Sequence, residues 1–458
     1  MAAPLKPTSV SCPAKVLVAG GYLVLDRAYT GLVFGLDARI HTVIEPIQTR
    51  AGVSISEIIV KSPQFLEAIW EYGYRLQGEG AGISVTQLSV GHEQSISHTR
   101  NPFIETALTY SLTYISTLLS PNQRIASSTI RILADQAYYS NPGTQRTSSS
   151  PFLDFNVTLK DAHKTGLGSS AALVTSFTAA VLGFYLPKEK WDGTTDEGQR
   201  VLHNLAQASH SHAQGKVGSG FDIASAVYGS CLYKRFSPSL LNALPAPGTA
   251  GFAKQLKDLV EGNTWDTEIQ KAAIKMPKGL RLVMCDVDCG SETPGMVKKV
   301  LKWRDENKEE ADRIWGALQQ GNERLAEELT RLASAGGDYQ TLREIIEGNR
   351  DLIRQMSEAS QVPIEPPQQT KLLDYCSKLQ GVVGGVVPGA GGYDAIVLFV
   401  EDKEETITKL KESLASYEAD DEQDGFKIGK VGVIGVREEM EGVRTEALSL
   451  YEEWATKS

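Results

Sequence analysis

A run of glycine and serine residues in the middle of the chain has the composition of a phosphate-binding turn. We call it the glycine–serine turn; its residues are Lys164, Thr165, Gly166, Leu167, Gly168, Ser169, Ser170, Ala171 and Ala172. Two glycines permit tight backbone angles and let main-chain N–H groups approach a ligand closely. An apolar, helix-compatible run follows over 173–186, so the turn opens onto a helix N-terminus, which attracts anions. Because the serine hydroxyls can also bind phosphate oxygen or a metal ion, the pattern predicts a cradle for nucleotide phosphates.

Other interpretations of the turn remain open from its residues. A loop with an N-capping serine requires no ligand. The P-loop pattern G-x-x-x-x-G-K-[ST] does not occur in the chain. The looser Rossmann pattern G-x-G-x-x-G/A is satisfied by 166–171, but five residues, 160–164, separate the turn from the strand expected at 155–159. A dinucleotide-binding turn usually follows its strand directly.

Two further residues become interesting beside a phosphate cradle. Lys15 precedes a short apolar strand at 16–19, and Asp222 ends a second small-residue turn at 214–222, just before a short helix at 223–229. Taken singly, a solvated lysine and a helix N-cap explain them. Together with the glycine–serine turn they form a candidate catalytic pair. A glycine-dense segment, 381–394, indicates either close backbone approach to another segment or a simple hairpin.

The elements that must position these residues alternate along the chain. Strands are expected at 32–45, 53–60, 83–90 and 129–133, which suits a mixed sheet. Asn101 and Pro102 should start one helix, and 197–214 should form another. The histidines of that second helix, His203, His210 and His212, are interpreted as packing or hydrogen-bonding residues. A polar loop at 139–151 is either a lid or a surface insertion. After a proline-containing linker at 237–249 we expect a strand at 280–287, helices at 295–308, 311–335, 339–360 and 368–379, and a strand at 395–400.

Length and composition limit the classes of function. A chain of 458 residues favours two or more domains. The net charge of -10 argues against nucleic acid or an anionic membrane as the main partner. Five cysteines without a C-x-x-C pattern suit a reducing compartment and supply no metal framework. The first residues lack a signal-peptide pattern, and the longest apolar run, 171–186, is short for a membrane span. Cytoplasm is the expected location.

Four segments occur in the order seen in one family: 13–22, 166–172, 218–222 and 388–394. In this set the chain resembles the GHMP kinases, which include galactose, homoserine and mevalonate kinases, and the likeness extends over about residues 10–400. The resemblance implies a two-domain α+β fold. Residues 1–236 would form an N-terminal nucleotide-binding domain with a mixed sheet and helices, and residues 250–458 a ferredoxin-like C-terminal domain that closes the cleft.

Within that family, segments 19–25, 213–222 and 391–394 resemble the fungal-type members that act on phosphomevalonate. The resemblance implies transfer of the γ-phosphoryl group of ATP to (R)-5-phosphomevalonate, giving 5-diphosphomevalonate on the route to isoprenoids and sterols. It implies that residues 164–172 bind ATP, that Ser170 contacts Mg²⁺, and that Lys15 and Asp222 are catalytic. Asn101 is a candidate for the purine pocket. Candidates for binding the acceptor substrate are Lys216, Ser219, Ser149, Ser150, Thr293, Gly391 and Gly392, and the last two would back the glycine–serine turn together with Gly389.

One position departs from the family pattern. Mevalonate kinases carry a metal-binding glutamate eleven residues before the catalytic aspartate, and here that position is Ser211. A carboxylate ligand is therefore unassigned, and Asp222 or water could serve instead. The alternatives kept open are another GHMP kinase such as mevalonate kinase, a non-catalytic metabolite sensor on the same fold, and a Rossmann-type oxidoreductase. The partners expected are small molecules, without nucleic acid or membrane, for a monomer or homodimer.

Overall fold

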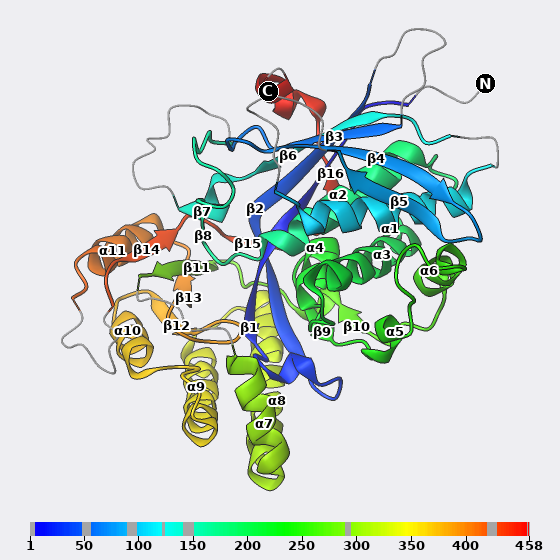
Figure 1. Cartoon of the computed structure of the whole chain (residues 1–458). Coiled ribbons are helices and arrows are strands. Elements are labelled where there is room, and N and C mark those ends of the chain that lie inside the picture. Colours follow the sequence, from blue (N-terminus) through cyan, green and yellow to red (C-terminus); the bar gives the residue numbers. More distant parts are fainter. Residues whose placement is uncertain are drawn as a thin grey trace.

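The fold is given by a computed structural model (Figure 1), which describes residues 5–47, 56–88, 99–120, 124–140, 151–288, 295–418, 428–455 and 457. Within these residues ten strands form one large sheet, in the order β10-β9-β2-β6-β3-β4-β5; β1 and β15 also pair with β2, and β16 pairs with β1. Only β3 and β6 are parallel, so this is the mixed sheet that the sequence predicted. Its first strands are β1 (Thr8–Ala19), β2 (Gly31–Pro46), β3 (Glu57–Lys61), β4 (Ile69–Gln77), β5 (Gly82–Gln87) and β6 (Ser128–Ala134).

A layer of helices packs on this sheet and carries the candidate site. The helix after the glycine–serine turn, α2 (Ser169–Tyr185), packs on β1 and β2. Its side chains are apolar on nearly all faces and nearly all buried, as expected for a helix in the middle of a core. Around it lie α1 (Pro102–Leu118), α3 (Asp196–Gln214) and α4 (Phe221–Tyr228). The chain then forms β9 (Cys231–Lys234), α5 (Ser239–Asn242), α6 (Phe252–Glu261) and β10 (Glu268–Gln270).

The second half contains a four-stranded antiparallel sheet in the order β12-β13-β11-β14. Read along the chain, this is the βαββαβ order of a ferredoxin-like sheet, as expected. In Figure 1 the ribbon of β1 and β2 passes between this sheet and the helices α3 and α4. The elements are β11 (Leu280–Val287), α7 (Met296–Glu306), α8 (Lys308–Ala335), α9 (Gln340–Ser360), α10 (Pro367–Ser377), β12 (Val382–Val386), β13 (Ala395–Glu401), α11 (Glu404–Ala415) and β14 (Val431–Ile434).

The last described residues return to the first sheet. β15 (Glu438–Glu439) pairs with β2, and β16 (Arg444–Thr445) pairs with β1, before the short helix α12 (Glu452–Ala455). The buried Arg39 of β2 donates to the carbonyl of Gly442 and to Ser11. The division into domains at 1–236 and 250–458 stays a prediction. β10, β15 and β16, which follow that division in the chain, belong to the first sheet.

Most expected helices and strands are present, and two differences matter. The strand expected at 155–159 is wrong: this segment is a loop that makes one isolated bridge, between Thr158 and Leu66. Phe155 is buried without strand pairing and its ring stacks on Phe65 at 5.0 Å, whereas Val157 and Leu159 are partly buried. A two-residue hairpin, β7 (Tyr139–Ser140) with β8 (His163–Lys164), leads into the glycine–serine turn instead. The 237–249 linker contains α5 and is followed by the unpredicted α6.

Residues 17–30 connect the two halves of the molecule. Gly389 donates its N–H to the carbonyl of Leu17, and the hydroxyl of Tyr22 donates to the carbonyl of Ala390 at 2.6 Å. Tyr22 has a φ of +66°, a conformation that costs a non-glycine residue about 1–3 kcal/mol. Tyr22 and Leu23 pack among buried side chains of α7, α8 and α9, which hold this conformation. No helix among the described residues is both long and apolar enough to cross a bilayer.

We expect Gly21→Ala to destabilise the protein, because a Cβ at Gly21 would overlap the carbonyl oxygen of Gly389. Backbone cannot rotate away as a side chain can, so the cost should reach about 1–3 kcal/mol. Thermal unfolding measures the change. Gly316→Ala is the control, since a Cβ there in α8 meets nothing within 4 Å and alanine favours a helix. An unchanged Tm in Gly21→Ala would show that the two segments do not need this close contact.

Candidate active site

Lys15 lies where strand β1 meets the glycine–serine turn. Its backbone N–H donates to the carbonyl of Leu167 at 3.3 Å. Its side chain crosses Gly168: a Cβ on that glycine would lie 2.6 Å from Cε and 3.0 Å from Nζ of Lys15. Gly168 also has a φ of +81°. Glycine is therefore needed at 168 both for the backbone angle and for the space that the lysine occupies.

Some residues of the glycine–serine turn are fixed in the protein interior, and others are exposed to solvent. The buried Thr165 donates its hydroxyl to the carbonyl of Ala137 at 2.6 Å, and Leu167 is buried in the core. Lys164 and Gly166 are exposed, whereas Ser169 and Ser170 are partly exposed. Helix α2 begins at Ser169, and no described side chain caps its N-terminus. Its first N–H groups and its dipole are thus available to an anion.

Asp222 lies in the first turn of α4, which packs against both α2 and β1. The preceding backbone is fixed by Arg235, at the end of β9. Its guanidinium donates to the carbonyls of Val217 and Gly218 and, at 2.7 Å, to that of Leu25. One side chain therefore ties the loop before Asp222 to the segment after Lys15. Sequence reasoning missed Arg235, since no motif links it to either segment.

Lys15 and Asp222 interact electrostatically within this site. Burial lowers the pKa of the Lys15 amine, and the nearby negative charge of Asp222 raises it by less. The Lys15 Nζ also lies 5.6 Å from the centre of the Phe221 ring. The structure thus brings the two candidate catalytic residues together beside the glycine–serine turn.

Ser170 makes a contact that sequence reasoning did not foresee. The Nε2 of His210, on α3, lies 3.1 Å from the Ser170 hydroxyl oxygen. Burial lowers the pKa of His210, and Asp222 raises it by less. Ser211, where the family pattern would place a glutamate, is buried and accepts from the amide of Gln207 at 3.0 Å. In the sequence, only the spacing of His210 from Asp222 could have indicated that His210 belongs to this site.

A cavity of about 210 Å³ opens beside the turn. Its wall includes Asn101, Lys164, Ser169 and Ser170, so four of the expected ATP-binding residues share it. Four aromatic side chains also line it, namely Phe65, Trp70, Phe103 and Tyr139. The side chain of Asn101 also caps α1 by accepting from the N–H of Ile104. Such a wall, apolar and aromatic with a few polar groups, suits a flat ring system.

The candidates for acceptor binding are less well grouped. Lys216 is exposed at the end of α3, and the carbonyl of Ser219 accepts from the Tyr233 hydroxyl at 2.7 Å. Gly391 lies against the carbonyl of Ile364, and Gly392 donates its N–H to the same oxygen. These contacts connect the glycine-dense segment to the loop after α9. The remaining candidates, Ser149, Ser150 and Thr293, lie outside the described residues.

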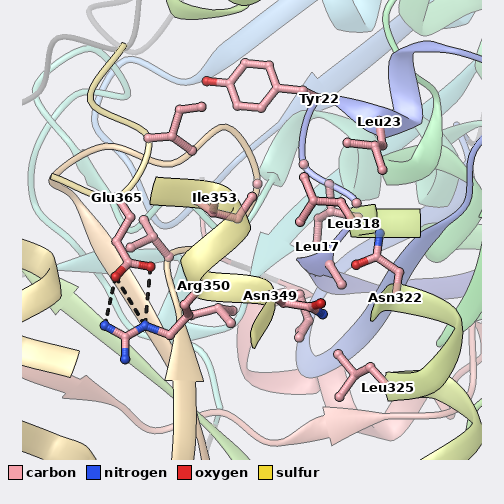
Figure 2. A pocket seen from close by; sticks show the side chains of 18 of the residues that line it. Leu17, Tyr22, Leu23, Leu318, Asn322, Leu325, Asn349, Arg350, Ile353 and Glu365 are labelled. Carbon is pink, nitrogen blue, oxygen red and sulfur yellow. Dashed lines mark hydrogen bonds and ion pairs between the residues drawn. The ribbon is translucent and has the colours of Figure 1, made fainter. Parts of the chain in front are cut away.

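Figure 2 shows a second, smaller cavity of about 40 Å³ behind the segment 17–23. Arg350 and Glu365 line it and form a buried ion pair at 2.8 Å. Asn322 also lines it, and its amide nitrogen has no hydrogen-bond partner among the described residues. This volume suits one or two waters. The cavity therefore lies in the packing between segment 17–23 and the helices α8 and α9.

Family models match two parts of the chain. The model described as GHMP kinases N terminal domain matches residues 134–230, and the model described as GHMP kinases C terminal matches residues 325–417. The first match contains the glycine–serine turn, His210 and Asp222. The second contains the helices and strands around the glycine-dense segment. Both matches indicate one class of protein, the small-molecule kinases of the GHMP type.

Similar proteins indicate which GHMP kinases this chain most resembles. A phosphomevalonate kinase of Gibberella zeae is 53% identical over 449 residues, covering 97% of this chain and 98% of that protein. A phosphomevalonate kinase of Aspergillus fumigatus is 46% identical over 492 residues, covering 98% and 99%. One from Arabidopsis thaliana, described as peroxisomal, is 31% identical over 480 residues, covering 89% and 92%. The chain belongs to the phosphomevalonate kinase family of the GHMP kinases, so the Rossmann-type alternative is wrong.

Solved structures agree with this fold. The Streptococcus pneumoniae phosphomevalonate kinase in complex with phosphomevalonate and AMPPNP has a TM-score of 0.58 and 17% identity, covering 93% of this chain and 99% of that one. At this identity the likeness concerns the arrangement of helices and strands. It supports the two-domain α+β architecture expected from the sequence.

We expect Lys15→Met to lose activity without losing stability. We expect this cation to offset phosphate charge during transfer, so its removal should lower kcat at least about 100-fold. Because burial holds the lysine pKa below that of the unfolded chain, the charged amine disfavours folding at pH 7, and this penalty disappears only as the pH rises toward the unfolded pKa. Met removes the penalty, so the Tm at pH 7 should stay equal or rise. A clear fall in Tm would assign Lys15 a mainly structural role.

Proposed function

We propose that this protein transfers the γ-phosphoryl group of ATP to (R)-5-phosphomevalonate and forms 5-diphosphomevalonate, in the mevalonate route to isoprenoids and sterols. The proposal rests chiefly on one observation: the Lys15 amine crosses Gly168 at the open N-terminus of α2 and interacts electrostatically with Asp222. This arrangement supplies fixed positive charge where phosphate groups crowd together. Membership of the phosphomevalonate kinase family supports the choice of acceptor.

Phosphoryl transfer requires positioning and charge neutralisation more than covalent chemistry. In the proposed arrangement the N–H groups of residues 166–170 hold the ATP phosphates, and Lys15 offsets the charge of the two substrates. The cavity that contains Asn101 and Trp70 takes the purine. Lys164, at its rim, is a further contact for a phosphate. These roles follow from which residues share the cavity and the turn.

The acceptor determines what Asp222 must do. A phosphate monoester has a second pKa near about 6, so at neutral pH it is already largely an anionic nucleophile. Asp222 therefore need not remove a proton, as it would for an alcohol. We assign it the task of orienting Lys15 and the acceptor. Their electrostatic interaction in the structure supports this assignment.

The residues present suit Mg²⁺ as the cofactor. Among the described residues, no cluster of three or more His, Cys, Asp and Glu side chains could hold a metal ion. Mg²⁺ does not need such a cluster, because it keeps several waters and binds through substrate phosphates. The Ser170 hydroxyl is the ligand that the turn offers, with Asp222 in reach of the same site. When bound, Mg²⁺ would neutralise charge on the phosphate oxygens.

An ADP-release assay across several acceptors tests this function. We expect turnover with 5-phosphomevalonate and little with mevalonate, galactose or homoserine. Asp222→Asn should lower kcat more than about tenfold, because the orienting charge is lost. A preference for mevalonate would favour the mevalonate kinase alternative. Absence of ADP release with every acceptor would favour the metabolite-sensor alternative.

Lys216→Ala should raise KM for 5-phosphomevalonate about tenfold and leave KM for ATP unchanged, if this lysine binds the acceptor phosphate. Steady-state kinetics with each substrate varied in turn measures both values. Lys188→Ala is a matched control, since it removes one exposed lysine beyond the opposite end of α2. Equal changes in the two KM values would remove Lys216 from the acceptor site.

Location and assembly are further parts of the proposal. The described cysteines Cys12, Cys231, Cys285 and Cys376 are free and buried, which suits a reducing compartment such as the cytoplasm. The Arabidopsis thaliana relative is described as peroxisomal, so imaging of the tagged protein is the direct test. We keep a monomer or homodimer acting on small molecules as the working assembly.

A further inference from the structure

His210 reaches the glycine–serine turn from a different helix. It lies in the last turns of α3, is 2% exposed, and its ring packs beside Phe103 of α1 at 5.6 Å. Its Nε2 lies 3.1 Å from the hydroxyl oxygen of Ser170, in the first turn of α2. The buried His210 ring thus forms a hydrogen bond with Ser170, the side chain that the proposed function assigns as a metal ligand.

The direction of this hydrogen bond follows from a third residue. The amide nitrogen of Gln214 lies 3.3 Å from the same Nε2 of His210. An amide nitrogen only donates, so Nε2 presents its lone pair and accepts. The two donors share the one lone pair of Nε2, and the Ser170 hydroxyl, the closer at 3.1 Å, donates its single hydrogen to the ring. Both lone pairs of the hydroxyl oxygen remain available on the side away from His210.

A hydroxyl that binds a cation needs this orientation. A metal ion interacts with oxygen lone pairs, and a hydrogen that points at the ion repels it. A rotating hydroxyl would lose orientational freedom on binding, and a fixed partner removes that cost in advance. The acidic group that acts on His210 is Asp222, which lies on α4 across the same site.

We infer that His210 is a positioning residue that holds the Ser170 hydroxyl with its hydrogen toward the imidazole and its lone pairs toward the phosphate end of the site. This inference rests on the proposed function, since it takes Ser170 as a ligand of the divalent cation. It also accounts for the departure at Ser211. One residue along a helix turns the side chain by about 100°, and the residue of α3 that reaches the turn is 210, not 211.

The central experiment compares His210→Leu with His210→Gln. Leucine cannot accept a hydrogen bond, whereas glutamine carries an acceptor oxygen at a similar reach. His210→Leu should raise the Mg²⁺ concentration for half-maximal activity roughly 10- to 100-fold, with KM for 5-phosphomevalonate little changed. His210→Gln should restore much of the wild-type response. The control is His212→Leu, an exposed residue two positions along that packs beside Tyr110.

A second measurement does not depend on turnover. Binding of Mn²⁺ to the protein with AMPPNP, followed by electron paramagnetic resonance, should weaken in His210→Leu and recover in His210→Gln. The Tm without nucleotide reports whether each variant is folded. If His210→Leu is unstable, His210→Asn replaces it, because its shorter amide ends nearer the backbone than Nε2.

A double variant separates positioning from packing. If His210 acts through the hydroxyl, adding His210→Leu to Ser170→Ala should change Mg²⁺ dependence no further. An unchanged metal response in active His210→Leu, equal losses in Leu and Gln variants, or additive losses in the double variant would each overturn the inference. Wild-type protein that releases no ADP with any acceptor would instead overturn the proposed function, while the Mn²⁺ measurement would still decide the role of His210.

Discussion

The site depends on one lysine ammonium that is partly withdrawn from water. Lys15 lies across a glycine, under the first turn of α2, with Asp222 as its opposite charge. A buried cation is unfavourable unless other groups compensate it, and here Asp222 compensates only part of the cost of burial. The Lys15 ammonium lies at the glycine–serine turn, where the proposed function places the phosphate groups of the substrates. The surrounding structure fixes both partners: β1 holds the lysine, and Arg235 holds the loop before the aspartate.

Local patterns in the sequence were sufficient to predict most of the main helices and strands. The apolar run after Ser170 is buried on nearly all faces and forms α2, and the pattern of Asn101 with Pro102 does start a helix with the asparagine as its cap. The expected strand at 155–159 failed because alternating apolar residues also suit a buried loop. Phe155 stacks on Phe65, and Leu159 lines the cavity beside the turn. Phe155 is buried and Val157 and Leu159 are partly buried, but the segment pairs with no neighbouring strand beyond one isolated bridge.

Long-range pairs explain what the sequence could not show of the site. Lys15, Asp222 and the glycine–serine turn could be grouped through a family resemblance, and the structure places them together. Arg235 and His210 belong to no motif, because their partners lie on other elements: Leu25 is on the segment after β1, and Ser170 is on α2. A histidine on a helix face gives no sign of which helix it will meet. Only the packing of α2 against α3 selects His210.

The return of the chain to β1 has a consequence for biosynthesis. Arg39 bonds to the carbonyl of Gly442 across a separation of 403 residues, and β1 receives its outer partner, β16, from the same region. A ribosome delivers β1 long before β16, and domains normally fold as units during synthesis, N-terminal first. The half of the molecule that contains the larger sheet cannot complete this sheet in that way. The edge of β1, the strand that carries Lys15, lacks its partner β16 until translation is nearly over, so nascent chains are exposed there to chaperones and to mispairing with one another.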